Sequence, residues 1–84
     1  MADVKLYTTN PCGFCTQAKA LLAARGVDYD EVDLDKDPEG RAALVALTGQ
    51  MTFPQILVGE RVLGGFRELL EADRAGTLDQ LLAA

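Results

Sequence analysis

Two cysteines are the residues of this sequence best suited to chemistry, and they stand close together in the segment Cys12-Gly13-Phe14-Cys15. Side chains spaced three residues apart on a helix share one face, so the two sulfur atoms can bond to each other. This spacing is typical of a redox-active dithiol, which alternates between two thiols and a disulfide. Cys12 and Cys15 are therefore the candidate catalytic residues.

The segments on either side of the pair predict which cysteine reacts first. Residues 4–8 alternate apolar and polar side chains, as a strand does, and residues 12–25 have a helical pattern that ends at Gly26. Cys12 would then lie at a helix N-terminus, where unpaired backbone N–H groups and the helix dipole favour a thiolate. Cys15 would lie one turn deeper. We therefore predict that Cys12 is the nucleophile and Cys15 the resolving thiol. Lys19 is a candidate for helping to activate Cys12.

Two other interpretations of the cysteine pair compete with a redox role. A purely structural disulfide across four residues would stabilise the fold by at most about 2 kcal/mol. A zinc site needs four ligands, whereas the chain has two cysteines and no histidine, so two chains would have to share the metal. A strand-to-helix turn favours the redox interpretation over both.

The composition excludes several classes of function. The absence of histidine rules out a Ser-His-Asp triad and a Cys-His dyad. The net charge of −5 disfavours nucleic acid and anionic membranes as partners. The longest apolar run, residues 42–47, is too short to cross a bilayer, and two cysteines are too few for a secreted disulfide framework. We expect one cytoplasmic domain spanning residues 1–84.

The order of predicted elements indicates the fold. Strands are expected at residues 4–8, 29–34, 55–58 and 61–63. Helices are expected at residues 12–25, at residues 38–48 and from Gly64-Gly65 to residue 75. A last short helix is expected from Thr77, where a capping-box pattern begins. The order is β-α-β-α-β-β-α with a helical C-terminal turn. A β-α-β unit requires a parallel strand pair, and a two-residue turn requires an antiparallel hairpin. The chain is therefore predicted to be an α/β protein with a mixed four-stranded sheet flanked by helices, which is a thioredoxin-like arrangement. On the first helix, we expect Phe14, Ala18, Leu21 and Leu22 to share the buried face.

Two further segments contain residues that could bind a peptide-like substrate. In Thr52-Phe53-Pro54-Gln55 the proline has no N–H group, so it should begin the third strand. A cis peptide at Phe53-Pro54 would expose the backbone of Phe53 beside the cysteines, whereas a trans peptide would only start the strand. In Gly64-Gly65-Phe66-Arg67, two glycines before a helix allow close backbone approach and leave N–H groups free to hold a carboxylate, unless they form an ordinary turn.

Taken together, Cys12-Gly13-Phe14-Cys15, Thr52-Phe53-Pro54-Gln55 and Gly64-Gly65 resemble the glutaredoxin family over nearly the whole chain. The resemblance implies a thiol-disulfide oxidoreductase that reduces protein disulfides and glutathione-mixed disulfides. It implies glutathione, or another low-molecular-weight thiol, as co-substrate, with no tightly bound cofactor. It also implies that the Phe53-Pro54 peptide is cis.

The resemblance further implies a binding site for glutathione. In the family, the segment ending in cis-proline binds the cysteinyl part through its backbone, and the Gly-Gly turn binds the glutamyl carboxylate. A basic or amide residue in the position of Arg41 binds the glycine carboxylate. The implied glutathione-binding residues are Arg41, Thr52, Phe53, Pro54, Gly65, Phe66 and Arg67.

Departures from the family pattern leave two alternatives open. Gly13 stands where dithiol members usually have proline, and members without that proline can bridge a [2Fe-2S] cluster between two subunits, with the residue matching Cys12 as a ligand. Phe66-Arg67 resembles redoxins that thioredoxin reductase reduces directly. Thr8, Thr9 and Asn10 also lack the basic residue that usually precedes the first cysteine. We expect a monomer, and a dimer only if a cluster is bound.

Overall fold

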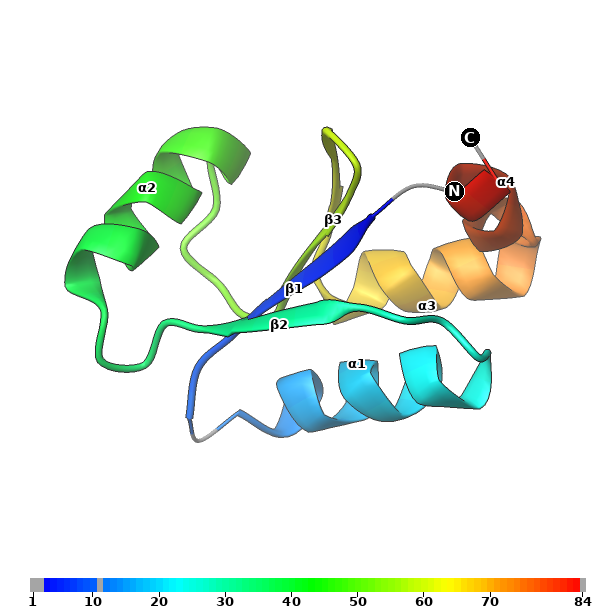
Figure 1. Cartoon of the computed structure of the whole chain (residues 1–84), viewed down its shortest axis with the longest axis horizontal. Coiled ribbons are helices and arrows are strands. Elements are labelled where there is room, and N and C mark those ends of the chain that lie inside the picture. The colour runs from blue at the N-terminus through cyan, green and yellow to red at the C-terminus, as the bar shows by residue number, and fades with distance from the viewer. Residues whose placement is uncertain (1–2, 11, 84) are drawn as a thin grey trace.

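The computed structural model describes residues 3–10 and 12–83 of the chain (Figure 1). The termini of the predicted domain, Met1-Ala2 and Ala84, and also Pro11 lie outside the described residues. The elements are β1 (Val4–Thr8), α1 (Gly13–Ala24), β2 (Asp30–Asp33), α2 (Pro38–Thr48), β3 (Gln55–Val58), β4 (Arg61–Gly64), α3 (Phe66–Ala75) and α4 (Thr77–Ala83). The predicted element order is confirmed, and most predicted boundaries agree within one residue.

The sheet has the mixed topology that the connections require. Its strand order is β2-β1-β3-β4, with β1 parallel to β2 and antiparallel to β3, and with β3 antiparallel to β4. The register pairs Thr8 at the end of β1 with Asp33 at the end of β2. Because these two strands are parallel, the carboxyl ends of both lie at the sheet edge where α1 begins.

Helices cover both faces of the sheet, as predicted. In Figure 1, α1 and α3 lie on one side of the strands and α2 on the other. Successive side chains of a strand point to opposite faces, so β3 contributes to two cores. Ile56 packs with the α1 and α3 residues Leu22 and Leu69, whereas Leu57 packs with Leu44 of α2. The thioredoxin-like fold predicted from the element order is thus confirmed.

Local sequence signals fix the ends of α2. Asp37 precedes the helix, and its Oδ1 accepts a hydrogen bond from the Gly40 N–H at 2.9 Å. Pro38 occupies the first helical position, where a missing N–H costs nothing. Gly49 ends the helix at a φ of 73°, in the left-handed region that glycine adopts without strain. These signals therefore set the bounds of the helix that carries Arg41.

The Thr77 hydroxyl at the start of α4 makes a different contact from the one that the sequence predicts. The sequence predicts a capping box at Thr77, with its hydroxyl bonded to the N–H of its own helix. Instead, the Thr77 hydroxyl donates to the Ala72 carbonyl of α3 at 3.3 Å, and no capping contact from Thr77 is present among the hydrogen bonds of the described residues. The hydroxyl satisfies an orphan carbonyl at the end of α3 because the two helices follow each other after only one residue, Gly76.

An ion pair links α1 to α3 on the surface. The Arg25 guanidinium donates two hydrogen bonds to the carboxylate of Asp73, at 2.7 and 2.8 Å. These hydrogen bonds lower the pKa of the Asp73 carboxyl below 3.8 and raise the pKa of Arg25. The pair thus links the C-terminal parts of α1 and α3 at the surface.

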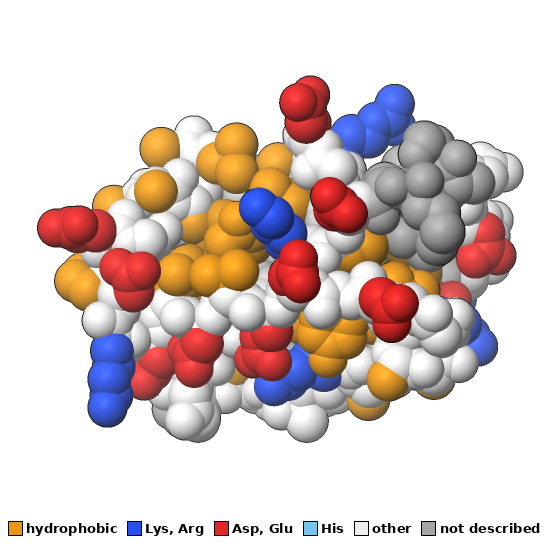
Figure 2. Space-filling view, in the orientation of Figure 1, with side chains coloured by type: hydrophobic (Ala, Val, Ile, Leu, Met, Phe, Trp, Pro, Cys, Tyr) orange, Lys and Arg blue, Asp and Glu red, His pale blue; other side chains and the backbone are white. Residues whose placement is uncertain are grey.

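The surface agrees with the acidic composition. Figure 2 shows Asp and Glu side chains spread over the visible face, with hydrophobic side chains gathered toward α2. Met51 and Leu47 belong to the exposed apolar residues, with 82% and 57% of their surfaces accessible. None of the described helices has the length and apolar character that crossing a membrane requires.

Candidate functional site

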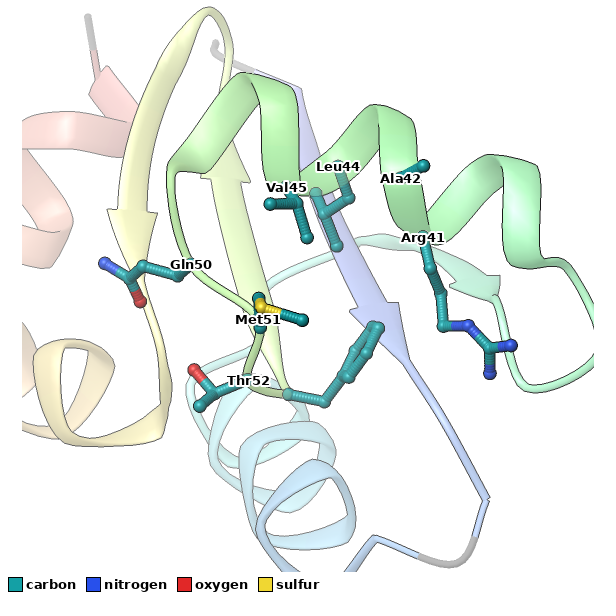
Figure 3. Close-up of a pocket in the computed structure, with 8 residues that line it drawn as sticks. Arg41, Ala42, Leu44, Val45, Gln50, Met51 and Thr52 are labelled. Atoms are coloured by element: carbon teal, nitrogen blue, oxygen red, sulfur yellow. The ribbon is translucent and has the colours of Figure 1, made fainter.

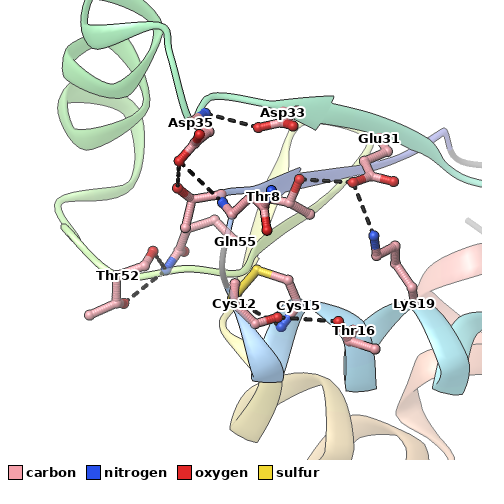
Figure 4. The surroundings of a disulfide bond; sticks show 12 residues. Thr8, Cys12, Cys15, Thr16, Lys19, Glu31, Asp33, Asp35, Thr52 and Gln55 are labelled. Atoms are coloured by element: carbon pink, nitrogen blue, oxygen red, sulfur yellow. Dashed lines mark hydrogen bonds and ion pairs between the residues drawn. A yellow bond between two sulfur atoms is a disulfide. The ribbon is translucent and has the colours of Figure 1, made fainter.

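The turn between β1 and α1 holds the two cysteines in a disulfide (Figure 4). Cys12 is the residue that caps α1, with an extended backbone, and its Cα lies 5.2 Å from that of Cys15. Cys12 is half-buried, whereas Cys15 is only 2% exposed. The order of exposure agrees with the sequence prediction, because the outer sulfur is the one that a substrate can reach.

The first turn of α1 provides a donor to the outer sulfur. The Cys15 N–H donates to Cys12 Sγ at 3.1 Å. This N–H is one of the groups at a helix N-terminus that have no partner inside the helix. A backbone donor in this position favours the thiolate over the thiol at Cys12 once the disulfide is reduced.

Phe14 does not lie where the sequence predicted. It was expected on the buried face of α1, yet 59% of its surface is exposed. The buried residues of α1 are Cys15, Ala18 and Leu22. Cys15 therefore takes the inward position in that turn, and Phe14, about 100° away on the helix, points aside. There its ring stacks on Phe66, with the centroids 5.9 Å apart.

An open groove of about 610 Å³ brings together most of the predicted binding residues. It is lined by Phe14, Thr52, Phe53, Pro54, Gly65, Phe66, Arg67, Glu68 and Leu70. The Phe53-Pro54 peptide, which lines the groove, is cis, as predicted. Three segments far apart in the sequence thus meet in this groove, and Phe14 connects the groove to the disulfide turn.

Glu68 changes the predicted role of the Gly-Gly turn. The sequence predicts free N–H groups here, but the Gly65 N–H donates to the Glu68 carboxylate at 3.0 Å. Glu68 is the third residue of α3, and a glutamate in this position commonly reaches back to the N-cap backbone, which is the signal that could have identified it. A carboxylate from this chain therefore already occupies part of the α3 N-terminus.

Arg41 lies in a neighbouring pocket of about 200 Å³ (Figure 3). This pocket is lined by Arg41, Ala42, Leu44, Val45, Gln50, Met51, Thr52 and Phe53. The Arg41 guanidinium donates to the Asp35 carbonyl at 2.9 Å, which fixes its side chain along one wall. The pocket shares Thr52 and Phe53 with the groove, whereas Arg41 itself does not line the groove.

Gln55 holds the shared loop in place, a role that the sequence did not indicate. Its side chain is completely buried. Its Nε2 donates to the Thr52 carbonyl at 2.9 Å, the Thr52 hydroxyl at 3.2 Å and the Gln50 Oε1 at 3.1 Å. The backbone that the resemblance assigns to substrate binding is therefore anchored from inside the sheet.

A second, polar pocket lies against the cysteines on the side of β1 and β2 (Figure 4). Its volume is about 290 Å³, and it is lined by Thr8, Thr9, Asn10, Cys12, Cys15, Thr16, Lys19, Glu31 and Asp33. The Glu31 carboxylate accepts hydrogen bonds from the Thr8 hydroxyl at 2.9 Å and from Lys19 Nζ at 3.2 Å. No cluster of three or more potential metal ligands occurs among residues 3–10 and 12–83.

Comparisons with known proteins agree with this geometry. The glutaredoxin family model matches residues 4–63. A glutaredoxin from Pseudomonas aeruginosa is 46% identical over 84 residues, covering 100% of both chains. Glutaredoxin 3 from Escherichia coli is 38% identical over 82 residues, covering 98% of this chain and 99% of the relative. The crystal structure of a buckwheat glutaredoxin-glutathione complex superposes with a TM-score of 0.89 at 30% identity, covering 98% of this chain and 77% of that one.

Proposed function

The chain belongs to the glutaredoxin family, and we propose that it reduces protein disulfides and glutathione-mixed disulfides with glutathione as its reductant. Family membership and the Cys12–Cys15 disulfide support a thiol-disulfide oxidoreductase. The observation that carries the glutathione proposal is the groove beside the disulfide turn, formed by Phe14, the 52–54 segment and the start of α3. A buckwheat glutaredoxin with a similar fold was crystallised in complex with glutathione.

In the proposed reaction, Cys12 is the nucleophile. Its thiolate attacks one sulfur of the substrate disulfide, so a Cys12–substrate bond forms and the other sulfur leaves as a thiolate that takes a proton from water. For a glutathione-mixed disulfide, a second glutathione thiolate then attacks the bound glutathione and releases oxidised glutathione. For a protein disulfide, Cys15 attacks Cys12 and frees the substrate thiol, and two glutathione molecules then reduce the Cys12–Cys15 disulfide.

The groove supplies the features that a small anionic peptide needs. Its volume of about 610 Å³ lies within the roughly 300–1,000 Å³ of typical ligand pockets. In the proposal, the backbone of Phe53 pairs with the cysteinyl part of glutathione. Because Glu68 occupies the Gly65 N–H, we assign the glutamyl carboxylate to the next N–H groups of α3, at Phe66 and Arg67.

Arg41 is proposed to bind the glycine carboxylate of glutathione. It lines the pocket that continues the groove past Thr52 and Phe53, and its side chain is fixed by the Asp35 carbonyl. An arginine and a carboxylate form strong, charge-assisted hydrogen bonds. Arg67 lines the groove and Arg41 the adjoining pocket, so each cavity has one arginine in a chain of net charge −5.

The remaining parts of the proposal follow from the chemistry. A dithiol that acts as a reductant depends on a compartment with a reducing thiol pool, so we propose that the protein works in the cytoplasm. We also propose that it acts as a monomer and without a tightly bound cofactor. Its macromolecular partners would be proteins with accessible disulfides. No observation on the described residues favours a cluster-bridged dimer or reduction by thioredoxin reductase over this proposal.

Two cysteine variants test the proposed function. We expect Cys12→Ser to abolish the reduction of both a glutathione-mixed disulfide and a protein disulfide. Cys15→Ser should retain most of the first activity and lose most of the second, since only the second needs a resolving thiol. Ala23→Ser, an exposed change on α1, serves as the matched control. Reduction of the mixed disulfide by Cys12→Ser at the wild-type rate would refute the proposal.

A further inference from the structure

The buried position of Cys15 creates a chemical problem that Cys12 does not have. Only the thiolate form of cysteine attacks a disulfide, so Cys15 must lose its proton before it can resolve a mixed disulfide at Cys12. Cys15 is 2% exposed, and burial disfavours the charged form of a thiol. A group that accepts this proton would therefore accelerate the resolving step.

The polar pocket behind the disulfide contains such a group. Cys15 and Glu31 both line the pocket, Cys15 from α1 and Glu31 from β2. The strand register pairs Glu31 with Leu6, whose side chain is in the core beneath α1, so the Glu31 side chain points to the same face of the sheet. The pocket volume of about 290 Å³ leaves room for water between the carboxylate and the thiol.

Two hydrogen bonds orient the Glu31 carboxylate. The Thr8 hydroxyl, which is 2% exposed, donates to its Oε2, and Lys19 Nζ donates to the same oxygen. Lys19 lies four residues after Cys15 on α1, so the two share one side of that helix. Glu31 is thus tied to the helix that carries the resolving cysteine, as Figure 4 shows.

The charges around the pocket distinguish Glu31 from its neighbours. The charged groups that face it are Lys19 from α1 and Glu31 and Asp33 from β2, while β1 contributes the neutral Thr8. Asp33 accepts a hydrogen bond from the Asp35 N–H at 2.9 Å, in the turn that follows β2. Of the two carboxylates, only Glu31 contacts the cysteine-bearing helix in the described residues.

We propose that Glu31 is the general base for Cys15. The Cys15 proton passes through water in the pocket to the Glu31 carboxylate. The Cys15 thiolate attacks Cys12 Sγ, the Cys12–Cys15 bond forms, and the bond between Cys12 and the substrate sulfur breaks, so that the substrate leaves as a thiolate with the electron pair. Glu31 then returns the proton to solvent, which its exposed fraction of 37% allows. This inference rests on the thiol-disulfide chemistry of the proposed function but not on glutathione.

A stopped-flow experiment separates the two cysteines. Reduced full-length protein is mixed with excess dithiobis(nitrobenzoate), whose coloured thiolate is released once when Cys12 attacks and again when Cys15 resolves the mixed disulfide. The first phase depends on reagent concentration and the second does not. General bases contribute roughly 100-fold or more when they contact the proton directly, and we expect about tenfold through water at neutral pH.

The proposal predicts a specific pattern in the variants. Glu31→Gln should slow the second phase about tenfold at neutral pH and leave the first unchanged. The deficit should shrink only at pH values above the roughly 8.5 of a free thiol, because a buried thiol ionises unaided at a higher pH than a free one. Glu31→Asp, which keeps a carboxylate, should recover part of the rate. Asp30→Asn is the matched control, because it removes the same charge from the neighbouring residue of β2. Asp30 pairs in register with the exposed Lys5, so this variant should change neither phase.

Other outcomes would overturn the inference. If Glu31 acted only through its negative charge, Glu31→Gln would accelerate the second phase, because it would remove a charge that repels the thiolate. If its role were only structural, the deficit would be the same at every pH. An absent first phase in the wild-type protein would refute the thiol-disulfide chemistry itself, whereas a normal first phase with an unchanged second phase in Glu31→Gln would reject only the role of Glu31.

Discussion

Replacement of the buried Gln55 by methionine should separate substrate binding from stability. Gln55 lies at the start of β3 with no exposed surface, and its Nε2 holds the Thr52 carbonyl, the Thr52 hydroxyl and the Gln50 side chain. Methionine has a similar length and shape but cannot donate a hydrogen bond. Gln55→Met therefore releases the loop that lines both the groove and the Arg41 pocket, while the core remains filled.

The expected change in stability is small because two effects oppose each other. The two amide hydrogens make at most two full hydrogen bonds, each contributing about 1 kcal/mol, so about 2 kcal/mol is lost. Gln55 Oε1, however, is buried without a hydrogen-bond partner among the described residues. Leaving such an atom unsatisfied costs roughly 1–3 kcal/mol, and methionine removes this cost. The free energy of unfolding should therefore change by less than about 1 kcal/mol.

The effect on binding has no such compensation. About 2 kcal/mol of hydrogen bonding holds residues 52–53 in the groove, and each 1.4 kcal/mol corresponds to a factor of about ten in an equilibrium constant. We expect KM for a glutathione-mixed disulfide to rise by up to about 30-fold, with kcat nearly unchanged because the Cys12 turn is untouched. Urea unfolding and steady-state kinetics measure the two quantities, with the exposed Gln80→Met as control. A loss of more than 2 kcal/mol in stability at unchanged KM would show that the Gln55 hydrogen bonds stabilise the fold without positioning the groove for substrate.

Three further changes test the packing and the electrostatics. Leu22→Ala removes a completely buried side chain from the core under α1 and should lower the free energy of unfolding by about 2–5 kcal/mol in urea titrations. Gly64→Ala places a Cβ at a φ of 121° and 2.9 Å from Glu68 Cγ, so we expect a loss of about 1–3 kcal/mol in the same titrations together with a higher KM. For Asp73, the lowered pKa means that the ionised carboxylate stabilises the folded state above the unfolded pKa and loses this effect as the pH falls through the folded value. The difference in stability between wild type and Asp73→Asn should thus be present at neutral pH and vanish well below pH 3.8; a constant difference at all pH values would contradict the ion pair.

The sequence predicted those parts of the fold that depend on local chemistry. Asp37-Pro38 and Gly49 mark the ends of α2 because capping and left-handed backbone preferences act within a few residues. The parallel or antiparallel orientation of paired strands could also be predicted, because a β-α-β connection and a two-residue turn each permit only one of the two. The position of Cys12 before α1, which exposes one sulfur and buries the other, depends on the same local rules.

The parts that the sequence did not predict depend on contacts between distant segments. Helical periodicity placed Phe14 with the buried residues, but the packing of α1 on the sheet gave that position to Cys15, and Phe66 then became the partner of the exposed ring. Glu31 meets Thr8 across 23 residues, and this pairing exists only once β1 and β2 are aligned. The anchoring role of Gln55 was hidden for a related reason, since a polar residue at the start of an apolar strand does not reveal which loop it will hold.

The assignment of Cys12 as the residue that exchanges with glutathione is the central claim, and intact-mass spectrometry tests it most directly. Reduced Cys15→Ser protein is incubated with oxidised glutathione, so that no resolving thiol can remove the adduct. We predict one glutathione per chain, located on Cys12 by peptide mapping, and no adduct on Cys12→Ser, whose Cys15 is buried. The absence of an adduct on Cys15→Ser, or an equal adduct on Cys12→Ser, would contradict the claim.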